Sequence, residues 1–140
     1  MSEGLLFAVE TSLSRLSYSE QSSAQRVFTL LWELEAEVNN GGFWQYFYNL
    51  SGEHAPEAPD ALRAIGANRC ASLVDRALTA VAILPEDYAI EDRRREIVNG
   101  LTSEVRDSLN ELDTEFYTYP DNLSALLTDF IQAHRYEFSI

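Results

Sequence analysis

A stretch of two asparagines and two glycines, 39–42, divides the most apolar part of the chain into two segments. The segment before it repeats apolar side chains at the three- and four-residue intervals of one helix face: Ala24, Val27, Phe28, Leu31, Leu34 and Val38. The segment after it, 43–50, is rich in aromatic residues and lacks the alternation of a strand. Asparagine and glycine tolerate the left-handed backbone that ends helices. The stretch therefore predicts that a helix ends near Val38 and that a tight corner leads into a second, aromatic helix.

The other segments also repeat with helical spacing. Apolar stripes run through 5–16, 60–84, 86–119 and the segment that begins near Pro120. We expect Gly66 to be either a break in the second of these or a point of close contact, and we expect 86–119 to form one long helix despite Gly100. Ser17 and Glu20 fit a capping box for the helix that follows them. The predicted fold is all-α: a single compact domain, 1–140, of about five to seven helices.

The charge of the chain is strongly negative. Twenty-three acidic residues face ten basic ones, all of them arginine, which gives a net charge of −13. Binding to nucleic acid requires cationic contacts to phosphates, so we expect no direct nucleic-acid binding, and anionic membranes are disfavoured for the same reason. A basic protein would be attracted instead. The alternative is that the charge only keeps the protein soluble.

Two further features of the sequence predict the cellular compartment of the protein. No apolar run approaches the roughly 18 residues that cross a bilayer, and the N-terminal segment lacks the basic start of a signal peptide. A single cysteine, Cys70, excludes an internal disulfide framework and suits a reducing compartment. We therefore predict a cytoplasmic protein.

Residues that could support catalysis or metal binding are few. The chain holds two histidines, His54 and His134, and neither lies in a spacing typical of zinc or di-iron sites. Cys70 lies in an apolar helical segment, where a free cysteine is usually a small core residue. The sequence contains no nucleophile elbow and no phosphate-binding loop. We expect no metal, no cofactor and no enzymatic activity.

Acidic residues line the predicted helix in the second half of the chain. Glu104, Asp107 and Glu111 follow i, i+3, i+7 spacing and share one outward face, and Asp113 and Glu115 extend the acidic character. Carboxylates about 5–6 Å apart along a helix resemble a row of backbone phosphates, which DNA-binding proteins grip with arginine and lysine. A solvated helix face is the alternative. The arginines at 93–95 are expected to pair with Glu91, Asp92 and Glu96.

The asparagine–glycine corner allows two interpretations. In the structural one, its aromatic residues fold back onto the preceding helix and supply core, while its amides bond within the corner. In the functional one, four polar side chains form a recognition patch: Asn39, Gln45, Tyr46 and Asn49.

The corner also carries a resemblance. Its pattern is E-x-N-N-G-G-F-x-Q-Y-F-x-N, formed by Glu37, Asn39, Asn40, Gly41, Gly42, Phe43, Gln45, Tyr46, Phe47 and Asn49. An A-L-x-x-I-G-A segment at 61–67 and an L-D-x-x-F-Y segment at 112–117 follow. Over about residues 20–138 the sequence resembles a bacterial family of small all-α domains that includes a DNA-mimic protein. In such a family the motif residues are expected to be architectural.

The resemblance implies a non-catalytic function. In the family's namesake role, an acidic dimer imitates duplex phosphates and occupies a helix-turn-helix regulator, which keeps the regulator off its operator. We therefore expect a basic DNA-binding protein as partner, contacted through Glu104, Asp107, Glu111, Asp113 and Glu115. A homodimer is also expected from an apolar surplus that comprises Trp32, Trp44, Tyr117 and Tyr119. The alternative function is an immunity-type module that binds a protein or ligand at the corner.

Overall fold

The computed structural model describes residues 2–139, and all regular structure within them is helical. The α-helices are α1 (Ser2–Leu13), α2 (Ser23–Tyr48), α3 (Ala58–Ala64), α4 (Asn68–Val81), α5 (Glu91–Asn99), α6 (Ser103–Tyr117), α7 (Leu123–Ala133) and α8 (Arg135–Phe138). Three 3-10 segments join them: η1 (Tyr18–Glu20), η2 (Leu50–Glu57) and η3 (Pro85–Asp87). The all-α prediction is confirmed, and residues 2–139 form eight α-helices in one compact domain rather than the predicted five to seven.

Breaks at two glycines separate consecutive helices, and only the first of them was predicted. Gly66 adopts φ +86 and separates α3 from α4, which confirms the break. The predicted single helix over 86–119 was wrong, because α5 ends at Asn99 and α6 begins at Ser103. Thr102 caps the new helix, since its hydroxyl accepts a hydrogen bond from the Val105 N–H at 3.2 Å. Glycine followed by a threonine cap therefore ends one helix and starts another.

The capping boxes near the N-terminus differ from the prediction in place. Ser17 and Glu20 form their box around the short η1 turn. The long helix α2 has its own box, in which the Gln25 N–H donates to the Ser22 hydroxyl and the Ser22 N–H donates to the Gln25 side chain. Two consecutive boxes thus fix the entry into α2.

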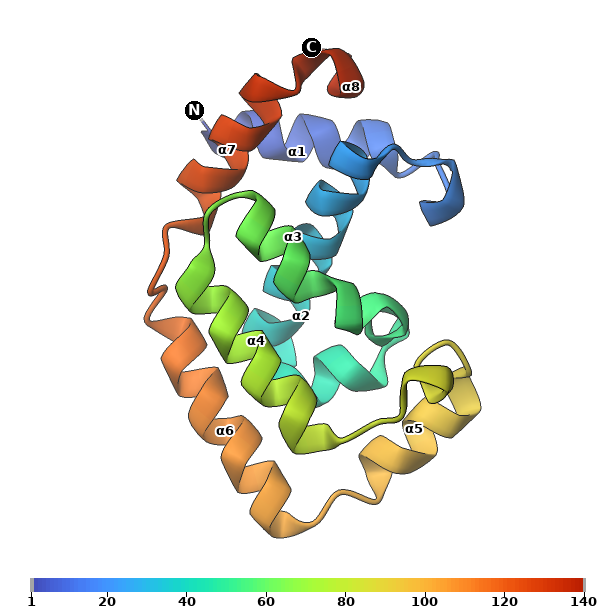
Figure 1. The fold of residues 1–140 in the computed structure, drawn as a ribbon. Helices are drawn as coiled ribbons and strands as arrows, with labels where there is room; N and C mark the ends of the chain where they lie inside the picture. The colour runs from blue at the N-terminus through green and yellow to red at the C-terminus, as the bar shows by residue number, and fades with distance from the viewer. Residues whose placement is uncertain (1, 140) are drawn as a thin grey trace.

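Helix α2 is the central element of the fold. Helices α3, α5 and α6 pack around its C-terminal half, and α4 packs on α3 and α6. Helices α1, α7 and α8 gather at its N-terminal end (Figure 1). Their shared core contains large side chains that are at most 1% exposed: Phe28, Leu34, Phe43, Tyr46, Phe47, Leu62, Leu109, Phe116 and Ile131. The aromatic segment after the corner therefore lies at the centre of the domain, as its composition suggested.

Candidate functional site

The corner at 39–42 is a kink within α2. Asn39 and Asn40 remain helical, and the backbone leaves helical geometry at Gly41 and Gly42. Gly42 has φ 77 and ψ −177, a combination essentially restricted to glycine. The first helix therefore extends two residues beyond its expected end at Val38, and the asparagines do not supply left-handed residues.

Asp113 on α6 holds the corner in place. Its carboxylate accepts a hydrogen bond from the Phe43 backbone N–H at 2.8 Å. A Cβ atom at position 42 would collide with this carboxylate, so the glycine also makes room for it. Desolvation raises the pKa of Asp113, and the bond from Phe43 opposes that rise. Asp113 was expected to extend the acidic surface, but it is half-buried and bonded to the corner.

Four other polar motif side chains form hydrogen bonds: Glu37, Asn39, Gln45 and Asn49. The Glu37 carboxylate accepts from the Gln45 amide at 3.1 Å and from the Asn49 amide at 2.7 Å. Tyr46 is 1% exposed. Asn39 is exposed and donates to the Tyr119 hydroxyl at 2.7 Å. A recognition patch requires exposed and available groups, so this arrangement weighs against the functional interpretation of the corner.

Arg94 closes the C-terminal end of α2, a function that we did not predict. It is 1% exposed, and its guanidinium donates to the carbonyls of Phe47 at 2.9 Å, Tyr88 at 2.5 Å and Asn49 at 3.0 Å. Burial lowers the pKa of this guanidinium. The helix carbonyls that lack intrahelical partners are thus satisfied by a cation, which also suits the negative end of the helix dipole.

The predicted pairing of the arginine triplet with nearby acids is confirmed for Arg93 and Arg95 and was wrong for Arg94 and Asp92. Arg93 pairs with Glu96 at 3.3 Å, and Arg95 pairs with Glu91 at 3.1 Å. Asp92 forms no ion pair within residues 2–139, whereas Asp87 lies 3.6 Å from Arg93. The arginine triplet is therefore neutralised or buried and leaves no basic patch on α5.

The acidic face of α6 divides into a paired and an unpaired part. Glu104, Asp107 and Glu111 are exposed, and none forms an ion pair with a described residue. Glu115 is exposed but pairs with Arg76, whose two terminal nitrogens lie 3.1 and 3.2 Å from its carboxylate oxygens. Arg106, on the same helix, lies over the Trp44 ring at 5.5 Å from its centroid. Three carboxylates of the predicted row remain free in this structure.

A family model described as DMP19-like protein matches residues 19–134. The chain belongs to this family. The match confirms the resemblance to a DNA-mimic family and covers the structure from η1 to the end of α7. Helices α1 and α8 lie outside it. Comparison with curated proteins found no match, and neither did comparison with solved structures.

Other classes of site find little support in the described part of this DMP19-like chain. Within residues 2–139, none of the helices has the length and apolar character of a membrane-spanning segment. Residues 2–139 hold no cluster of three or more side chains suited to a metal ion. Burial raises the pKa of the Cys70 thiol to about 11, and the Cys70 backbone N–H donates to Asp121 at 2.8 Å. This cysteine is a core residue with little thiolate at neutral pH.

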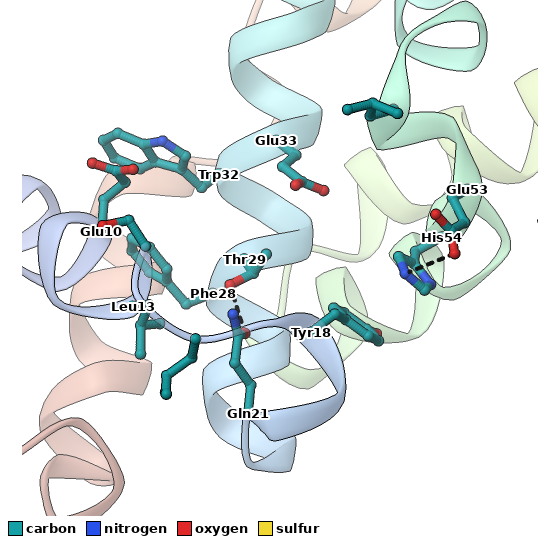
Figure 2. A pocket seen from close by; sticks show the side chains of 13 residues that line it. Glu10, Leu13, Tyr18, Gln21, Phe28, Thr29, Trp32, Glu33, Glu53 and His54 are labelled. Carbon is teal, nitrogen blue, oxygen red and sulfur yellow. Dashed lines mark hydrogen bonds and ion pairs between the residues drawn. The ribbon is translucent and has the colours of Figure 1, made fainter. Parts of the chain in front are cut away.

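A pocket of about 360 Å³ opens between the end of α1, η1, α2 and η2 (Figure 2). Its polar lining includes Glu10, Glu33 and Glu53, together with His54. The His54 ring stacks on Tyr18 with centroids 3.9 Å apart. None of these residues was predicted as a site, because helical spacing places Glu33 on a polar face but does not show that η1 and η2 approach it. The sequence offered one indication of this pocket, which is that an aromatic residue, Trp32, stands next to an acidic one, Glu33.

Proposed function

We propose that this protein is a non-catalytic DNA mimic that binds a DNA-binding protein of helix-turn-helix type and blocks its access to DNA. The observation that carries the proposal is the row of unpaired, exposed carboxylates on α6: Glu104, Asp107 and Glu111. Membership of the DMP19-like family supports it. That the asparagine–glycine motif marks the family stays a prediction.

Electrostatics explains how such a surface would act. The three carboxylates lie about one helical turn apart and accept charge-assisted hydrogen bonds from arginine and lysine side chains of the partner. The net charge of −13 steers a basic protein toward the mimic, and association is therefore fast and sensitive to salt. Glu115 can contact the partner protein only if it gives up its ion pair with Arg76. Asp113 is held in the fold by its hydrogen bond from the Phe43 N–H and is not part of the proposed surface.

Charge reversal tests the surface. The triple variant Glu104→Lys, Asp107→Lys and Glu111→Lys should lose capture of a basic DNA-binding protein from host lysate. We expect a loss of more than roughly tenfold in affinity, because each charge-assisted bond contributes about 1.5–3 kcal/mol. Capture by the wild type should fall as salt rises, and the captured protein should lose its operator DNA when the mimic is added.

A matched control separates the surface from bulk charge. Glu86, Asp92 and Asp129 are exposed, and no ion pair to a described residue engages them. Changing these three to lysine alters the net charge by the same amount and should leave capture within about twofold of wild type. Equal loss in both triple variants would contradict the proposed face, and so would capture that survives the α6 variant with its helical circular dichroism intact.

Self-association stays a separate prediction. Of the four aromatic side chains that suggested a homodimer, Trp32 and Trp44 are half-buried against the core. Tyr117 is 47% and Tyr119 is 39% exposed, and the Tyr117 hydroxyl donates to the Val38 carbonyl at 2.9 Å. Sedimentation equilibrium of wild type and the α6 triple variant would measure the oligomeric state and show whether it depends on the acidic face.

A further inference from the structure

We propose that the pocket between α1, η1, α2 and η2 is a binding site for an organic cation with a guanidinium or primary ammonium group. The half-buried, unpartnered carboxylate of Glu33, the acids on either side of it and the aromatic walls carry this inference. It does not rest on the proposed DNA mimicry. The elements that line the pocket lie in the upper and right-hand part of Figure 1, whereas α6 forms the lower left edge of the domain.

Glu33 is the central group of the pocket. Figure 2 shows its side chain leaving α2 on the side that faces His54 and Glu53. It is half-buried, yet its carboxylate forms no hydrogen bond or ion pair with any described residue. Desolvation raises its pKa, against a smaller lowering by His54. Burial removes part of the water around this carboxylate without supplying a partner from the protein, so a cationic ligand that donates hydrogen bonds to it would bind there.

The charges around Glu33 favour a cation. Glu10 from α1 and Glu53 from η2 join it in the lining, which contains no arginine. His54 is the one lining residue, among those described, that can become positive. Both of its ring nitrogens face carboxylates, since Nδ1 lies 3.0 Å from Glu57 and Nε2 lies 3.7 Å from Glu53. The pocket therefore attracts cations and repels phosphates and carboxylates.

The aromatic walls narrow the class of cation. Phe28 and Trp32 stack with centroids 5.5 Å apart, and Trp32 lines the pocket. The Tyr18 ring is already engaged by the Arg26 guanidinium, 4.9 Å from its centroid, and by the stacked His54 ring, so we expect Trp32 to supply the aromatic contact to a ligand. Aromatic faces beside carboxylates select organic cations over hydrated metal ions. The volume suits an alkyl guanidine or amine rather than a nucleotide.

Fluorescence titration with agmatine tests the site. Trp44→Phe leaves Trp32 as the single tryptophan, and the Trp44 indole N–H has no partner in the described structure, so its loss costs little. In this background we expect saturable quenching by agmatine and none by a neutral alkylurea of similar length. Glu33→Gln should weaken agmatine binding by roughly tenfold or more, because a buried charge-assisted bond is lost.

The control is Glu86→Gln, which removes the same charge from an exposed position far along the chain. It should bind agmatine within about twofold of the parent. Equal weakening by both variants, or no saturation in the parent, would overturn the proposal. If Glu33→Gln fails to fold by circular dichroism, the double variant Glu10→Gln, Glu53→Gln replaces it, with the same expected loss.

A second titration distinguishes whether the natural ligand is an arginine side chain of a protein or a free small molecule. A short neutral peptide with one central arginine is titrated beside agmatine. Tighter binding of the peptide identifies an arginine side chain of a protein as the ligand. Tighter binding of agmatine identifies a free small molecule. Failure of the α6 charge-reversal variant to change partner capture leaves this result unaffected, since the two experiments use different residues.

Discussion

At the corner of α2, the half-buried carboxylate of Asp113 accepts a hydrogen bond from the Phe43 N–H, whereas in the pocket the half-buried carboxylate of Glu33 has no partner among the described residues. Desolvation raises the pKa of both groups. At the corner, Glu37 and Asp113 bond to neighbouring groups within the protein, and Arg94 extends that pattern, whereas the Trp44 indole N–H has no partner in the described structure. Satisfied groups stabilise a fold, and an unsatisfied one is available to a ligand.

The largest effect in this comparison is expected from Arg94. Arg94→Met should lower the free energy of unfolding by about 4 kcal/mol, because three carbonyls lose their donor at a buried position. Urea denaturation followed by circular dichroism measures it. Arg76→Met, at the exposed ion pair with Glu115, is the control and should cost less than about 1 kcal/mol. Similar losses in both variants would show that Arg94 is no more than a surface charge.

Gly42 should give the next largest effect. Gly42→Ala should cost about 3 kcal/mol, because alanine is strained at φ 77 and its Cβ would displace the Asp113 carboxylate. Gly66→Ala separates the two causes, since φ there is +86 but no atom lies within 4 Å of the added Cβ. We expect that variant to lose only about 1 kcal/mol in the same urea experiment. Equal losses would mean that the collision with Asp113 adds nothing.

Sequence alone predicted the corner because its chemistry is local. Two glycines between apolar segments with helical spacing end one helix and start another wherever they occur. The break between α5 and α6 was missed because Gly100 was treated as a tolerated interruption, although Thr102 was available as a cap. A glycine followed within two residues by a capping side chain is the signal that would have found it.

The hydrogen bonds of Arg94 and Asp113 were harder to predict, because they join segments that are distant in the sequence. Arg94 follows Ile90 and precedes Val98 by four residues, so it lies on the apolar stripe of α5. Asp113 likewise follows Leu109 by four residues and borders the buried face of α6. Both spacings were available, but the partners, 47 and 70 residues away, follow only from tertiary packing. The pocket depends on the same kind of approach, by η1 and η2.

Glu33 should give the smallest effect and the opposite sign. Glu33→Gln removes a desolvated charge that no described residue compensates, so we expect a gain in stability of less than about 1 kcal/mol at neutral pH. Because burial raises the folded pKa above its unfolded value, wild-type stability falls relative to the variant as pH rises through the folded pKa. Below about pH 4.3, the unfolded value, both side chains are neutral and the difference should vanish.

Urea unfolding of wild type and Glu33→Gln at about pH 7 and about pH 4 measures this difference, with Glu86→Gln as the exposed control that should show none. A loss of stability on Glu33→Gln at neutral pH would mean that the carboxylate holds the fold together, as Asp113 does. A gain that disappears in acid would mean that the protein keeps an unpaired charge at a cost to its own stability. Selection for folding alone would remove such a charge, so its presence would favour a ligand in the pocket.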